Sequence, residues 1–208
     1  MNTISYLKEV YGYGVPIFLK DIRIGGKSKV SIRKDLSRGV EDGKIIRKTQ
    51  GVYCFKEENE FSDSVSFRDI ITAKYIKDDF GIPGLDLEIF GYYTGLSFMH
   101  SLGLTQQVPA VLEIVTNNTS CKREYKIKNR SVKLIKPKTT INRFNYKILQ
   151  FLDLFYLIDK DEIKENKVTL RKYISNNLSK ADLEKYLGLY PARIINLILN
   201  GGLFDAFR

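Results

Sequence analysis

The sequence of 208 residues contains no tryptophan, only two cysteines and a single histidine. Cys54 and Cys121 cannot form a disulfide framework for a chain of this length, so we expect both to be small packing residues in a reducing compartment. With His100 as the only histidine, a zinc site would need ligands that the chain does not offer. The sequence therefore predicts no metal site and no metal cofactor.

The sequence also lacks the segments that direct a protein to or across a membrane. Its first ten residues have no cationic region followed by an apolar core, which a signal peptide requires. No run approaches the roughly 18 consecutive apolar residues of a membrane helix, and the most apolar run, residues 151–158, is interrupted by Asp153. We expect a cytoplasmic protein with no membrane partner.

Positive charge is the most prominent feature that is present. The formal net charge is +10 and the isoelectric point is near 9.4, which favours a polyanionic partner. Eight basic side chains and one acidic side chain lie in residues 121–140, and most of the remaining excess lies in residues 1–60 and 141–208. The apolar fraction of 43% is high enough for a folded core. The sequence therefore predicts a folded protein with two basic regions, one within residues 1–60 and one within residues 121–140.

The N-terminal part has the pattern of a winged helix-turn-helix. An apolar stripe at helical spacing predicts a first helix over residues 4–11, with Ile4, Leu7, Val10 and Tyr11 on one face. Pro16 suits the first position of a short second helix, which the glycines at 25 and 26 would end.

The next helix and a hairpin complete this pattern. Ile32, Leu36 and Val40 recur at a spacing of four, and Gly43 follows as a helix-ending glycine. Two short strand-like runs then flank the glycine at position 51, which predicts a hairpin that would form the wing.

The face of this helix opposite its apolar stripe carries Lys34, Ser37 and Arg38, with Ser31 and Arg33 at the flanks. Lysine and arginine can contact guanine edges or phosphates, and a helix N-terminus adds backbone donors for a phosphate. The alternative is a solvated basic face, which the order of helices and hairpin makes less favoured. The predicted DNA contacts are Lys27, Ser28, Lys29, Ser31, Arg33, Lys34, Arg38, Arg47, Lys48, Thr49 and Gln50.

The rest of the chain alternates between helix and strand patterns. After a polar linker we predict a helix from residue 67, a helix that ends at Leu102, a strand at 111–116 and a hairpin within 122–138. The last third is helical, with an apolar stripe of Phe144, Ile148, Phe151, Leu152 and Phe155. The predicted fold is α+β, with a winged helix domain over 1–58 and a mixed domain with a helical C-terminal third over 65–208.

The predicted hairpin within 122–138 supplies a second basic surface. Alternation along its strands would leave one face densely positive. This surface could extend a DNA interface, bind RNA, or meet an acidic protein, and lysines that protect a sheet edge are an equally good account. Its residues are Lys122, Lys126, Lys128, Arg130 and Lys133.

Three segments carry a resemblance to a known family. They are GVY at residues 51–53, GYYTGLSFMHSLGLTQQVP at residues 91–109 and EIVTN at residues 113–117. In these segments the chain resembles the AbiEi antitoxins of abortive-infection, type IV toxin-antitoxin systems. Gly39 is a departure, because such helices usually carry a leucine there; a glycine weakens the core contact and lets the helix approach its neighbour more closely.

The resemblance implies a DNA-binding autorepressor and antitoxin. Its winged domain would bind an inverted-repeat operator, one half-site per copy. Its C-terminal domain would counter a nucleotidyltransferase-like toxin, often without a stable complex. The alternative is a protein-interaction antitoxin or adaptor whose winged unit does not read DNA.

Catalysis is not expected. The run at residues 26–28 resembles part of a phosphate-binding loop, but Asp21 stands where its first glycine is required. Glu113 lies in an apolar strand, yet Val115 occupies the lysine position of an E-x-K nuclease pattern. We therefore predict a protein that is not an enzyme, with no catalytic residues and no cofactor.

Overall fold

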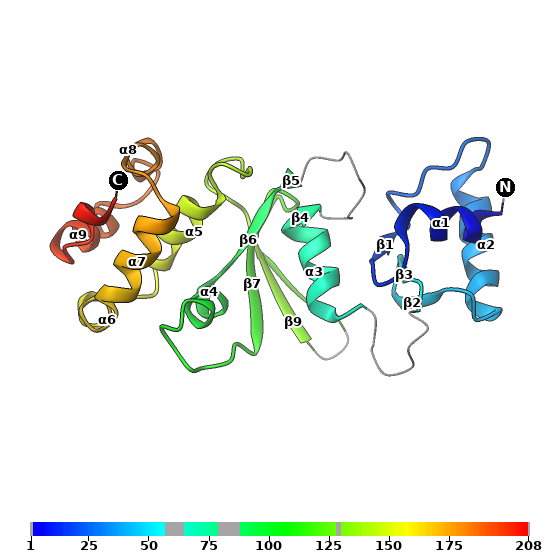
Figure 1. The fold of residues 1–208 in the computed structure, drawn as a ribbon, viewed down its shortest axis with the longest axis horizontal. Helices are drawn as coiled ribbons and strands as arrows, with labels where there is room; N and C mark the ends of the chain where they lie inside the picture. Colours follow the sequence, from blue (N-terminus) through cyan, green and yellow to red (C-terminus); the bar gives the residue numbers. More distant parts are fainter. Residues whose placement is uncertain (1, 57–64, 79–87, 128–129, 208) are drawn as a thin grey trace. The chain divides into compact units, whose positions relative to one another are not determined.

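The structure is a computed structural model that describes residues 2–56, 65–78, 88–127 and 130–207 (Figure 1). The chain forms two compact units, residues 1–87 and 88–208. Each contains helices and a small sheet, which confirms the predicted α+β class. Within the described residues no helix combines the length and the apolar character needed to cross a membrane. Lys128 lies outside the described residues.

The described part of the first unit contains three helices and a three-stranded antiparallel sheet. The sheet has the order β1-β3-β2, and a bulge between Arg47 and Thr49 interrupts the pairing of β2 with β3. The helices and strands are α1 (Thr3–Tyr11), β1 (Ile17–Phe18), α2 (Lys29–Glu41), β2 (Ile46–Thr49), β3 (Val52–Cys54), α3 (Phe67–Tyr75) and β4 (Lys77–Asp78). The predicted first helix, basic helix and hairpin are confirmed.

The predicted short helix after Pro16 is wrong. Ile17 and Phe18 form β1 and pair with Tyr53 and Val52 of β3. β-branched and aromatic residues favour a strand that is covered on both faces, and both residues are buried here. The unit therefore has a winged arrangement in which turns replace the middle helix.

The core of the first unit has two parts. The larger part joins α1, α2 and the sheet through buried apolar residues. Val65 and Ile70 pack with Phe18, Val52 and Cys54 in the smaller part, so α3 belongs to this unit, which extends beyond the predicted boundary at residue 58. The predicted inner residue Val10 is instead 36% exposed.

The second unit begins with a mixed four-stranded sheet of order β6-β7-β9-β8. Strands β7 and β9 are parallel, and the other neighbours are antiparallel. Its elements are β5 (Glu88–Ile89), β6 (Gly91–Thr94), α4 (Gly95–Ser101), β7 (Val111–Thr116), β8 (Arg123–Ile127) and β9 (Arg130–Ile135). The predicted strand at 111–116 and the hairpin are confirmed.

The prediction of a helix that ends at Leu102 is correct only for the second half of the segment. Tyr92 and Tyr93 form β6, and the helix α4 starts at Gly95, whose φ of 65° marks the break between them. The two tyrosines pair with Val115 and Ile114 of β7, so tertiary pairing decides the state of this segment.

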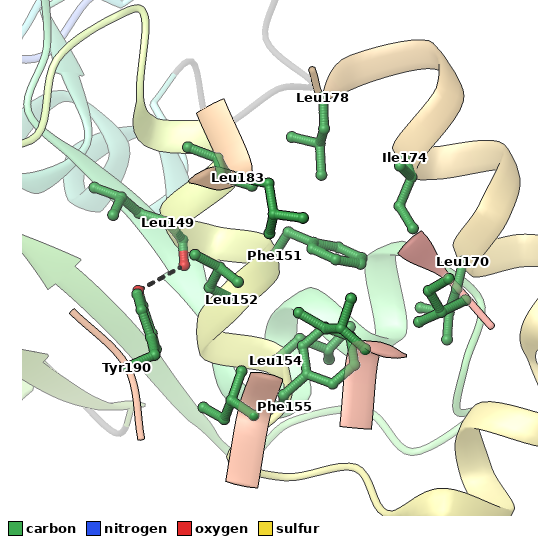
Figure 2. Close-up of a cluster of buried hydrophobic side chains, with 14 of the residues drawn as sticks. Leu149, Phe151, Leu152, Leu154, Phe155, Leu170, Ile174, Leu178, Leu183 and Tyr190 are labelled. Carbon is green, nitrogen blue, oxygen red and sulfur yellow. Dashed lines mark hydrogen bonds between the residues drawn. The ribbon is translucent and has the colours of Figure 1, made fainter. Parts of the chain in front are cut away.

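A helical region completes the second unit (yellow to red in Figure 1). Buried aromatic and aliphatic side chains of α5 form its centre, and Figure 2 shows them with side chains of the following helices. Phe144, predicted to belong to the apolar stripe of α5, is 76% exposed. The elements are α5 (Tyr146–Leu154), α6 (Lys160–Glu165), α7 (Lys167–Asn177), α8 (Lys180–Leu187), α9 (Ala192–Asn200) and the 3₁₀ helix η1 (Phe204–Ala206).

The two cysteines differ in their surroundings. Cys54 is fully buried in β3, as predicted for a packing residue, whereas Cys121 is exposed in the turn before β8. The expectation that Cys121 packs in a core is wrong, because that residue precedes the strand and lies outside its paired register.

Candidate nucleic-acid interface

Helix α2 carries the largest group of predicted DNA contacts. The side chain of Ser28 caps it by accepting a hydrogen bond from the Ser31 N–H at 3.2 Å. Ile32 and Leu36 are buried on its inner face. Because an α-helix turns about 100° per residue, the residues one position after these lie on one flank of the helix. Arg33 and Ser37 therefore lie on this flank, and both are exposed.

Gly39 allows α2 to lie close to α1. It is buried, and a Cβ atom there would lie only 2.6 Å from Ile4 Cδ1 and 3.1 Å from Ile45 Cγ2. The closer approach expected from the glycine is therefore present, and it sets the position of α2 relative to the first helix.

A groove of about 600 Å³ lies between this flank of α2 and the hairpin of β2 and β3. We call it the α2-hairpin groove. Ser37 and Gln50 contribute a hydroxyl and an amide to its lining. None of the described residues that line it carries a carboxylate. Its cations are Lys20, Lys29, Arg33, Arg47 and Lys74.

The turn of the β2–β3 hairpin is hydrogen-bonded to the segment that follows β1. Gly51 adopts a φ of 72°, which a tight turn requires and which glycine adopts without steric cost. Its carbonyl accepts a hydrogen bond from the Leu19 N–H at 2.9 Å. This bond holds the segment of the neighbouring Lys20 at the groove, whose lining also includes Gln50 and Arg47.

Lys27 has a different environment from the other predicted contacts. Its ammonium lies 2.7 Å from the Asp35 carboxylate and 2.7 Å from the Thr3 hydroxyl, which also donates to Asp35. The hydrogen bonds from Lys27 and Thr3 lower the pKa of Asp35 below its ordinary value. These contacts join the start of α1 to α2, and Lys27 does not line the groove.

Of the other predicted DNA contacts on α2 and the hairpin, some line the groove and some do not. Of the predicted set, Lys29, Arg33, Arg47 and Gln50 line the groove. The others lie outside its lining: Lys34 and Arg38 exposed on α2, Ser28 and Ser31 at its capped start, and Lys48 and Thr49 partly buried on β2.

Two lining cations were missed by sequence reasoning. Lys20 was assigned to a helix that does not exist, and Lys74 belongs to α3, which was assigned to the other domain. Lys74 lies next to the Tyr75 ring, with its ammonium 5.2 Å from the ring centre. No local pattern marks either residue, because only the packing of distant segments brings both of them to α2.

The second basic surface is less uniformly positive than predicted. The register places Glu113 and Glu124 on either side of Lys133, on one face of the sheet, and Glu113 forms an ion pair with Lys133. Lys126 and Arg130 are exposed on the hairpin. Lys122 and Lys133 instead line a separate pocket of the second unit.

Comparison with protein-family models and with curated proteins finds no match at a significant level. The assignment to the AbiEi antitoxins therefore stays a prediction. In the described part of the chain no group of three or more histidine, cysteine, aspartate or glutamate side chains is arranged to hold a metal ion.

Proposed function

We propose that this protein is a DNA-binding transcriptional autorepressor and antitoxin of a toxin-antitoxin operon. The observation that carries the DNA-binding part is the charge of the α2-hairpin groove. Five cations from four segments converge on it, and its described lining contains no carboxylate. Such a surface attracts phosphates and releases their counterions, the main source of affinity for DNA.

The groove suggests how DNA would be held. Lys29, Arg33 and Ser37 are spaced by four residues along one side of α2, so all three can face a major groove together. Arg47 and Gln50 of the hairpin, with Lys20, would contact the flanking backbone. Repression follows because the bound protein excludes the transcription machinery. One unit covers one half-site, so two copies would occupy an inverted repeat.

The antitoxin part of the proposal has a separate source. It depends on the resemblance to AbiEi antitoxins in residues 91–109 and 113–117, which belong to the second unit. The toxin would be nucleotidyltransferase-like, and protection need not involve a stable complex. On this proposal the protein works in the cytoplasm by binding, not by catalysis.

The experiment is a salt series of fluorescence-anisotropy titrations with the protein's own upstream DNA and a scrambled duplex of equal length. We expect a preference for the upstream DNA of roughly a thousandfold or more. Lys29→Ala with Arg33→Ala should weaken binding by about tenfold or more and lower the salt slope by about two, because two phosphate or base contacts are lost.

A charge-matched control separates these contacts from net charge. Lys44→Ala with Lys56→Ala removes two exposed cations of the same unit that do not line the groove. This control should bind DNA almost as well as the unchanged protein. Equal, weak binding to both duplexes would overturn the repressor proposal and favour the interaction-only alternative.

A further inference from the structure

The second unit contains a smaller pocket of about 350 Å³ near the C-terminal end of α5. We call it the lysine pocket. One side is formed by the ends of β7 and β9, and another by the residues that follow α5. Its volume lies near the lower end of the roughly 300–1,000 Å³ typical of small-molecule sites.

Lysines supply most of the charge of this pocket. Lys133 is paired with Glu113, so it contributes little net charge. The Lys138 ammonium lies 5.2 Å from the centre of the Tyr156 ring and 5.0 Å from that of Tyr190. Lys122 and Lys136 are exposed, and neither has an ion-pair partner among the residues that the structure describes. Three cations therefore remain available to an anion.

Asp153, a carboxylate held by two tyrosines, also lines the pocket. The hydroxyl of Tyr92 donates to Asp153 at 2.7 Å, and that of Tyr190 donates to its other oxygen at 3.0 Å. The Tyr190 oxygen also lies 3.3 Å from the carbonyl of Leu149 (Figure 2). Burial raises the pKa of Asp153, against the opposing effect of the two tyrosine hydrogen bonds and Lys138. Each carboxylate oxygen keeps a lone pair that could accept a further hydrogen bond.

The wall beside the lysines is aromatic and apolar. The Tyr156 side chain is 44% exposed and Leu157 is 48% exposed, although both line the pocket. A flat ring could stack on Tyr156, and an aromatic contact of this kind with a base is favourable without base specificity. The pocket thus combines cations, a hydrogen-bond acceptor and an aromatic surface within a small volume.

We propose that the lysine pocket binds a nucleoside phosphate, with its phosphates at Lys122, Lys136 and Lys138 and its base against Tyr156. Asp153 would accept a hydrogen bond from a ribose hydroxyl or an amino group. A continuous nucleic-acid strand fits less well, because its phosphates would meet the carboxylates of Asp153 and Glu113, whereas the α2-hairpin groove presents none in its described lining. The proposal is independent of the DNA-binding function.

The test is isothermal titration calorimetry of the full chain with ATP, with GTP and with pyrophosphate. We expect saturable binding of at least one nucleotide, tighter than that of pyrophosphate. Lys136→Ala with Lys138→Ala should weaken it by about tenfold or more, because charge-assisted hydrogen bonds are lost. Lys160→Ala with Lys164→Ala, two exposed lysines of α6 outside the pocket, should leave it unchanged.

A second variant separates base from phosphate. Tyr156→Leu should weaken nucleotide binding much more than pyrophosphate binding, because the ring contacts the base directly, whereas Lys138 also lies against the Tyr190 ring. Absence of saturable nucleotide binding would overturn the proposal. So would equal loss in the α6 control, pyrophosphate binding as tight as that of ATP, or binding of a single-stranded oligonucleotide through the same lysines when ATP does not bind.

Discussion

Gly95 has a backbone conformation that residues with a side chain rarely adopt. Its φ is 65°, and a Cβ atom there would collide with the Glu113 carboxylate. We expect Gly95→Ala to lower the free energy of unfolding by about 1–2 kcal/mol or more, from backbone strain and displacement of that carboxylate. Urea unfolding followed by circular dichroism measures the change.

The matched control for this substitution is Gly188→Ala. Gly188 has an ordinary helical φ of −62°, and a Cβ atom there would contact nothing within 4 Å. Its replacement should leave stability unchanged or raise it slightly, because alanine loses less conformational entropy on folding. If both variants lost the same stability, strain at Gly95 would not be the cause.

The ion pair of Lys27 and Asp35 predicts a dependence on pH. The folded-state pKa of Asp35 is lowered, so the pair stabilises the fold above the unfolded-state pKa of about 3.9. That contribution is lost as pH falls through the lowered value. In hydrogen-exchange mass spectrometry, Asp35→Asn should reduce the protection of α1 near neutral pH.

The same variant should differ little from the unchanged protein at a pH below the lowered value, because Asp35 is then protonated in both states of the chain. A loss of protection that is equal at neutral and at acidic pH would show that the substitution acts through packing and not through the charge of the carboxylate.

Helix α5 is the central element of the second unit. Phe151 is fully buried, and its ring lies 5.1 Å from Phe155, 5.8 Å from Tyr173 and 6.1 Å from Phe207, centre to centre. Phe151→Ala should therefore cost about 3–5 kcal/mol of stability, since it removes apolar contacts and leaves a cavity. Urea unfolding followed by circular dichroism measures the loss.

Phe144 provides the control from the same predicted stripe. It precedes α5 and is 76% exposed, so Phe144→Ala should change stability by no more than about 0.5 kcal/mol. A large loss there would contradict the structure and restore the longer apolar stripe that the sequence predicts.

At the scale of the whole molecule, the two units allow the two proposed functions to be separated. The α2-hairpin groove belongs to residues 1–87, and the two longer segments that carry the antitoxin resemblance, 91–109 and 113–117, belong to residues 88–208. Lys29→Ala with Arg33→Ala should abolish repression of an operon reporter in cells yet leave protection from the neighbouring toxin intact. Loss of both functions in this variant, at normal protein levels, would show that antitoxicity depends on the groove.

Local sequence patterns, which involve residues near one another in the chain, were enough to predict several features of the structure. The buried face of α2 and the glycine turn of the hairpin were predicted correctly, because helical periodicity and turn geometry involve residues within a few positions. The predicted α+β class follows from the same local patterns. Four of the predicted DNA contacts line the groove for this reason.

Only the tertiary structure decided which cations share a surface. Pairing with β3 turned residues 17 and 18 into a strand, and packing of α3 on the first unit brought Lys74 to the groove. Lys27, which the sequence places beside the other cations, is held by Asp35 and Thr3. Each of these outcomes depends on contacts between residues far apart in the chain, which local propensity and spacing do not specify.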